Sequence, residues 1–146
     1  MSDLAPAGLL ALAAWGSLVG LDLASWPQLM LSRPIVAGGV AGLLLGDPVA
    51  GLTVGSLLEL FALDVLPIGA TRYPDFGVAA LAGVALAAGH DPSAMLGPAT
   101  ALGLVLALGS RPAIEAVRRG NARAASRAAD ALAAGDVGTV TAVHLG

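Results

Sequence analysis

The sequence places two carboxylates in a stretch that is otherwise almost free of charge. Residues 35–63 are apolar or small apart from Asp47, Glu59 and three uncharged exceptions, Pro48, Thr53 and Ser56. An isolated carboxylate in hydrocarbon is costly, and it is normally tolerated where it faces a partner group or water. We therefore take these two carboxylates as the first candidates for a functional site.

Glycines recur at every fourth residue around Asp47. One series is Gly38, Gly42 and Gly46 before Asp47, and the second is Gly51 and Gly55 after it, with Glu59 next in the second series. On a helix this spacing forms one face without side chains, here called the glycine stripe, and such faces let helix backbones approach closely in lipid. We expect Glu59 to point into a helix interface or a cavity rather than at lipid. The alternative to a functional Glu59 is a structural one, protonated or hydrogen-bonded between helices.

The tripeptide Gly46-Asp47-Pro48 divides the apolar stretch into pieces of about a dozen and about sixteen residues. Both are shorter than the ~20 residues that a helix needs to cross a ~30 Å hydrocarbon core. One interpretation is a pair of discontinuous helices whose free ends meet at mid-membrane and offer N–H and C=O groups to a solute. The other is a turn at the membrane surface, in which Asp47 caps a helix that begins at Pro48.

Composition identifies the class of protein. Hydrophobic residues make up 57% of the chain, charged residues make up 12%, and the mean hydropathy is +0.85, which indicates an integral membrane protein. We expect an all-α fold with about four short or full transmembrane helices, re-entrant or discontinuous segments, and a C-terminal amphipathic helix. The chain has no cysteine, which excludes disulfides and thiolate metal sites. We expect no metal site, no cofactor and no nucleic-acid partner.

Two irregular segments carry further polar residues. The first begins at Asp22, at the end of a helix over residues 8–23, and also contains Gln28 and Arg33. We expect a re-entrant or interfacial piece in which Asp22 pairs with Arg33; the alternative for Arg33 is an anchor that reaches the headgroups. The second segment, residues 64–75, is rich in Pro and Gly. Here Arg72 and Asp75 are close enough to neutralise each other, or Asp75 caps the next helix.

Two further apolar helices are expected at residues 76–89 and 93–110, the second with a kink at Pro98. His90 and Asp91 between them fit a capped turn better than a metal or proton-relay site. The decapeptides at residues 39–48 and 83–92 look alike, which hints at internal repetition.

The C-terminal part changes character, because five of the seven basic residues lie between residues 111 and 127. An apolar stripe opposite the arginines predicts an amphipathic helix on the inner leaflet or against a partner, and the positive-inside rule places it in the cytoplasm. We divide the chain into a membrane-embedded region over residues 1–110, this helix over residues 111–135, and the start of a missing further span over residues 136–146.

These motifs together resemble the IIC subunit of the mannose/fructose/sorbose class of the phosphoenolpyruvate-dependent sugar phosphotransferase system (PTS). The matching segments, in order, are Leu21-Asp22, Ser32-Arg33-Pro34, Gly46-Asp47-Pro48, Gly51-Leu52, Gly55, Leu58-Glu59-Leu60, Pro67-Ile68-Gly69-Ala70 and Pro74-Asp75. The resemblance covers most of the chain, although IIC subunits of the family are markedly longer, which predicts an N-terminal half or a partial copy.

The resemblance implies a multi-pass protein of the bacterial cytoplasmic membrane with re-entrant hairpins and inverted internal symmetry. It also implies an oligomer with a IID subunit, soluble IIA and IIB phosphocarrier domains, and a hexose-type sugar. By motif position, the expected sugar-site residues are Asp22, Gln28, Arg33, Asp47, Glu59 and Asp75.

The leading hypothesis is a IIC-type membrane subunit that forms part of a sugar translocation path and is not an enzyme by itself. The alternative is a truncated membrane scaffold that binds a partner through the glycine stripe and anionic lipid through the arginine-rich helix. An intramembrane enzyme is disfavoured, because the sequence offers no Ser-His, paired-Asp, His-metal or P-loop constellation.

Overall fold

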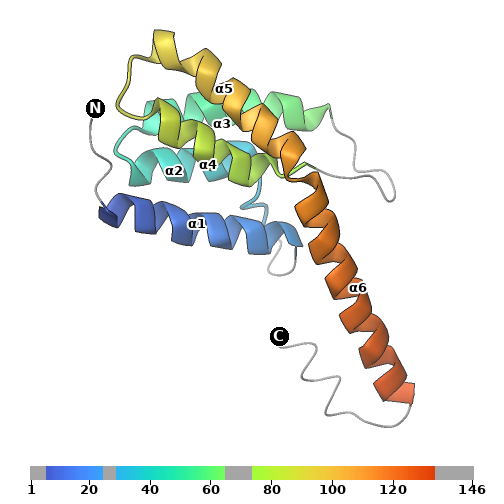
Figure 1. Cartoon of the computed structure of the whole chain (residues 1–146). Coiled ribbons are helices and arrows are strands. Elements are labelled where there is room, and N and C mark those ends of the chain that lie inside the picture. The colour runs from blue at the N-terminus through green and yellow to red at the C-terminus, as the bar shows by residue number, and fades with distance from the viewer. Residues whose placement is uncertain (1–5, 25–28, 65–73, 134–146) are drawn as a thin grey trace.

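A computed structural model describes residues 6–24, 29–64 and 74–133 of the chain. That part contains helices and connecting turns but no strand, which confirms the expected all-α fold. The helices are α1 (Pro6–Ala24), α2 (Pro34–Leu44), α3 (Pro48–Leu63), α4 (Phe76–Ala87), α5 (Pro92–Gly109) and α6 (Arg111–Ala133). Helices α1 to α5 pack together, and α6 projects from one end of the bundle (Figure 1).

Two helices are long and apolar enough to cross a membrane, namely Pro6–Leu23 and the helical stretch that begins at Pro92. The helices α2, α3 and α4 are apolar but have only 11, 16 and 12 residues. At 1.5 Å per residue, a 12-residue helix reaches only about 18 Å. Within the described residues, the model therefore provides two candidate spans and three shorter apolar helices.

Local chemistry sets the helix boundaries. Asp47 caps α3 by accepting a hydrogen bond from Ala50 N at 3.0 Å, and Pro48 occupies the first helical position. Asp91 caps α5 in the same way, with Pro92 at its first position. These caps confirm the turn chemistry predicted for both segments.

The helices α2 and α4 also end alike, each at a glycine in the left-handed region. Gly46 has φ +76° and Gly89 has φ +73°, values that L side chains rarely adopt. The chain thus forms two hairpins, α2–α3 and α4–α5, and the similar decapeptides cover the same part of each: the end of one helix, the turn and the start of the next.

The glycine stripe joins α2 to α3 within the chain. A Cβ atom added at Gly42 would lie 2.6 Å from the Asp47 carbonyl oxygen and 2.7 Å from the Gly51 Cα atom, so the two backbones are in direct contact. Gly38 and Gly55 make a similar approach one turn away. Gly46 was expected in the stripe but lies in the turn, because α2 ends before it.

Helix α4 occupies the centre of the bundle and contacts α1, α2, α3 and α5. Its buried side chains are small or of medium size, as at Ala80 and Val84. By contrast, the outer surface is strongly apolar: Leu10, Leu43 and Val105 are 67–72% exposed. Such a surface is typical of a protein that meets lipid or a partner there.

Helix α6 confirms the expected helix at the arginine-rich segment. In the described part of the chain it contacts only α1 and α5. The predicted apolar stripe consists of Ala113, Ile114, Val117, Ala124, Ala125, Ala128 and Leu132. Three of these residues, Ile114, Ala124 and Ala128, are half-buried, whereas Ala113, Val117 and Ala125 are exposed.

We predict that Gly42→Ala destabilises the protein, because the new methyl group would overlap the backbone of α3. Overpacking of this kind costs about 1–3 kcal/mol. The matched control is Gly20→Ala on α1, where a Cβ meets nothing within 4 Å. Helix loss followed by circular dichroism in detergent measures both variants. Equal stability of the two would contradict direct backbone contact between α2 and α3.

Candidate functional site

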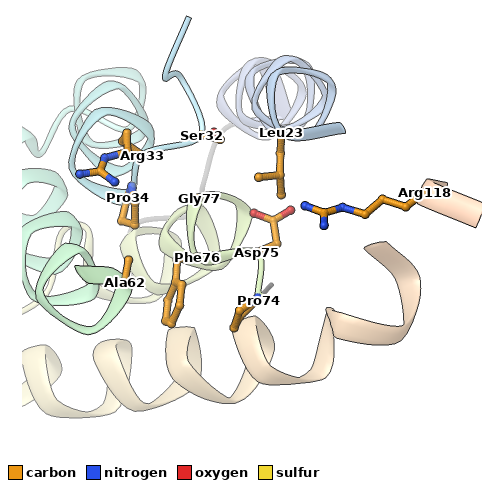
Figure 2. A pocket seen from close by; sticks show the side chains of 10 residues that line it. All are labelled: Leu23, Ser32, Arg33, Pro34, Ala62, Pro74, Asp75, Phe76, Gly77 and Arg118. Atoms are coloured by element: carbon orange, nitrogen blue, oxygen red, sulfur yellow. The ribbon is translucent and has the colours of Figure 1, made fainter. Parts of the chain in front are cut away.

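A pocket of about 260 Å³ lies at the end of the bundle where α1 and α3 finish and α2 and α4 begin. Its lining residues are Leu23, Ser32, Arg33, Pro34, Ala62, Pro74, Asp75, Phe76, Gly77 and Arg118 (Figure 2). Its volume is just below the ~300–1,000 Å³ typical of sites for drug-sized ligands. Two other cavities, one along α3 and one between α2 and α3, have uncharged linings.

Asp75 supplies the carboxylate of this pocket. Its Oδ1 atom accepts a hydrogen bond from Val78 N at 2.9 Å, so it caps α4, as the capping alternative predicted. Its own N–H donates to Ser110 Oγ at 2.8 Å, and Ser110 Oγ donates to Ala107 O. The side chain is therefore held by the start of α4 and the backbone by the end of α5, and the residue is only 9% exposed. The expected partner Arg72 lies outside the described residues.

Arg33 and Glu59 form an ion pair beside the pocket. Arg33 Nη2 lies 2.7 Å from Glu59 Oε1, and Ile35 N donates to Glu59 Oε2 at 3.3 Å. The Glu59 side chain is 13% exposed and faces the N-terminus of α2, which confirms that it points into a helix interface. There it also complements the positive end of the α2 dipole.

The predicted pairing of Asp22 with Arg33 is wrong, because Arg33 pairs with Glu59. Asp22 is 3% exposed and accepts hydrogen bonds from the backbone N–H groups of Leu29 and Ser32. Between these two residues Met30 has φ +63°, a conformation that costs roughly 1–3 kcal/mol outside glycine. Asp22 thus holds the turn that brings Ser32 and Arg33 to the pocket. Gln28 lies outside the described residues.

Asp47 lies at the opposite end of the bundle. Helix α2 runs from Pro34 at the pocket to the turn that contains Asp47, and α3 returns from this turn to Ala62 at the pocket. Besides capping α3, Asp47 accepts a hydrogen bond from Gly89 N at 3.1 Å, which links the two hairpins.

Sequence reasoning missed Arg118, which reaches the pocket from α6. Figure 2 shows its guanidinium directed toward the Asp75 carboxylate. The sequence placed Arg118 among five similar arginines, and nothing in the local pattern distinguishes it from Arg119 or Arg123. No group of three His, Cys, Asp or Glu residues that could hold a metal ion occurs in the described segments.

A known protein family resembles this chain over almost its whole length. A family model described as the PTS system sorbose-specific IIC component matches residues 6–146. The PTS system sorbose-specific EIIC component of Lacticaseibacillus casei is 40% identical over 65 residues, which are 44% of this chain and 23% of that protein. The PTS system mannose-specific EIIC component of Escherichia coli K12 is 35% identical over 65 residues, 44% of this chain and 24% of that protein.

A third relative is covered more completely. "Putative N-acetylgalactosamine permease IIC component 2" of Escherichia coli K12 is 30% identical over 101 residues, 68% of this chain and 75% of that protein. The chain matches about a quarter of the length of the sorbose and mannose relatives. No solved structure matches the chain.

We predict that Asp47 stabilises the fold by capping α3 and by linking the two hairpins. Asp47→Ala should cost about 1 kcal/mol through loss of the cap, and Asp47→Asn should cost less, because Asn is also a good N-cap. Thermal unfolding in detergent measures both effects.

The control for this measurement is Asp130→Ala, which removes an exposed carboxylate on α6. An Asp47→Ala variant as stable as wild type would show that the cap and the link between the two turns contribute nothing to stability.

Proposed function

Because the chain belongs to the PTS sorbose-specific IIC component family, we propose that it forms part of the path by which a sugar crosses the bacterial cytoplasmic membrane. Members of this family are membrane-bound transport subunits rather than catalytic phosphotransferases. The transfer of the phosphoryl group is therefore left to other subunits, and the task of this chain is to bind the sugar and let it pass.

The observation that carries the proposal is a charged pocket in a bundle whose outer surface is strongly apolar. Asp75 and Arg33 line a cavity of about 260 Å³, whereas the outer faces of α1, α2 and α5 expose large hydrophobic side chains. A carboxylate accepts hydrogen bonds from sugar hydroxyl groups, and a guanidinium donates to them. A monosaccharide satisfies both kinds of group without bringing a charge into the bundle.

The predicted site residues receive different roles in this proposal. Asp75 binds the sugar directly, and Arg33 forms another wall of the pocket while Glu59 holds its side chain. Asp22 and Asp47 position the chain, Asp22 by holding the turn before α2 and Asp47 by linking the two hairpins. Gln28 stays a candidate for sugar contact.

The proposed membrane arrangement follows from helix length. We propose that α1 and α5 cross the bilayer and that the shorter α2, α3 and α4 are re-entrant or discontinuous pieces sheltered between them, since backbone at membrane depth must be buried in protein or line a cavity. Residues 1–110 then form the membrane-embedded region, and the arginine-rich helix α6 lies at the cytoplasmic surface.

The proposed partners are a IID membrane subunit and soluble IIA and IIB domains, in an oligomeric complex. The exposed apolar side chains of α1 and α5, such as Leu10 at 72% and Val105 at 67% exposure, are available for contact with such a subunit or with lipid. The alternative, a scaffold that captures a partner through the glycine stripe, is weakened because the stripe is already used between α2 and α3.

We predict that wild-type chain in membranes with a IID subunit binds at least one of mannose, sorbose and N-acetylgalactosamine, the sugars that its relatives are named for. Asp75→Asn should weaken this binding about tenfold or more, which corresponds to ~1.4 kcal/mol. Asn is a good N-cap, so this variant keeps α4 intact. Glu59→Gln should weaken binding less, because it acts through Arg33. Equilibrium binding of radiolabelled sugars measures each effect.

The control is Asp91→Asn, which alters an N-cap carboxylate at the other end of the bundle and should leave binding unchanged. A wild-type chain that binds none of the three sugars, or an Asp75→Asn variant that binds as wild type does, would overturn the proposal.

A further inference from the structure

Arg118 is the pocket residue that comes from outside the bundle. Nine of the ten lining residues belong to α1, α2, α3, α4 or the turns that lead into them, and Arg118 alone of the ten belongs to α6. Its guanidinium is directed toward the Asp75 carboxylate (Figure 2). The amphipathic helix therefore completes one wall of the cavity.

The other arginines of α6 are placed differently. Arg119, next in the chain, lies 3.7 Å from Glu115 on the same helix, and Arg123 lies one turn further from the bundle. Neither residue lines the pocket. Arg118 thus reaches the pocket because of where α6 begins after Ser110. The basic composition of α6 does not by itself explain this contact, since Arg119 and Arg123 are equally basic and do not line the pocket.

The facing groups have complementary hydrogen-bonding chemistry. A guanidinium carries only donors, and an ionised carboxylate carries only acceptors. Each hydroxyl group of a sugar can donate one hydrogen bond and accept others. Two adjacent hydroxyl groups, a vicinal diol, can therefore donate to the carboxylate while accepting from the guanidinium, and charge assistance strengthens both kinds of bond.

We propose that Arg118 is a sugar-binding residue and that Arg118 and Asp75 together bind a vicinal diol of the transported sugar. This inference rests on the proposed function and adds a residue and a specificity rule to it. Arg118 donates to the diol oxygens, the diol donates to Asp75, and the Arg33–Glu59 pair bounds another side of the pocket. A bound sugar is then in direct contact with α6.

The test uses the full chain with a IID subunit in nanodiscs and the sugar of the three above that wild type binds most tightly. We expect Arg118→Gln to weaken binding about tenfold or more and Arg118→Lys to weaken it less, because Lys keeps the charge but not the planar set of donors. Arg123→Gln, which removes the same charge from the same helix, should change binding less than twofold. Both Gln variants alter exposed positions of α6 and should fold normally.

A second measurement separates direct contact from a structural role. Monodeoxy analogues of the same sugar each lack one hydroxyl group, and wild type should bind at least one of them markedly more weakly than the parent sugar. In Arg118→Gln that difference should shrink, because the arginine that recognised the missing oxygen is already gone. A merely structural role would weaken all of these ligands by the same factor.

The outcomes distinguish the two proposals. In the first case, wild type binds sugar and Arg118→Gln binds it as well as Arg123→Gln does. Arg118 then only contributes positive charge to the surface of α6, for example toward anionic lipid. This result overturns the inference and leaves the proposed function standing. If Arg118→Gln is weak but keeps the wild-type preference among deoxy analogues, direct diol recognition is overturned. If wild type binds no sugar, both proposals fail.

Discussion

Direct backbone contact between α2 and α3 is the constraint on which the rest of the arrangement depends. A Cβ at Gly55 would lie 2.7 Å from the Pro34 carbonyl oxygen, so the start of α2 lies against the last turns of α3. Glu59 follows one turn later on the same face and therefore reaches Arg33. A larger residue in the glycine stripe would push the helices apart and separate these two charges. The close packing of helix backbones, which lipid favours, thus also determines that Arg33 and Glu59 face each other.

Most of the fold could be predicted from local sequence because its boundaries have local causes. Asp47-Pro48 and Asp91-Pro92 start helices through capping and fixed φ, and the four-residue glycine spacing correctly placed Glu59 at a helix interface. The lengths of α2 and α4 could also be predicted from the turn residues that end these helices. These features depend on residues within a few positions of one another, which a sequence displays directly.

The site was less predictable because its residues meet through tertiary packing. Arg33 was assigned to Asp22, its nearer acidic neighbour in sequence, yet it pairs with a residue 26 positions away. Arg118 was counted with the surface arginines, since nothing near it in the chain indicates that the start of α6 faces Asp75. Asp47 had the right residue type for a polar site, but the path of α2 carries it to the far end of the bundle. Residue type thus identified candidates for the site, but only the packing of the helices shows which candidates line the pocket.

The hydrogen bond from Gly89 N to Asp47 has a mechanical consequence for the two hairpins. It ties them together at their turns, whereas their other ends surround the pocket. The two hairpins also pack against each other along their lengths, because α4 contacts both α2 and α3. A hydrogen bond at the turns opposes sliding of one hairpin along the other, so it also helps to keep Arg33 and Asp75 at a constant separation around the cavity.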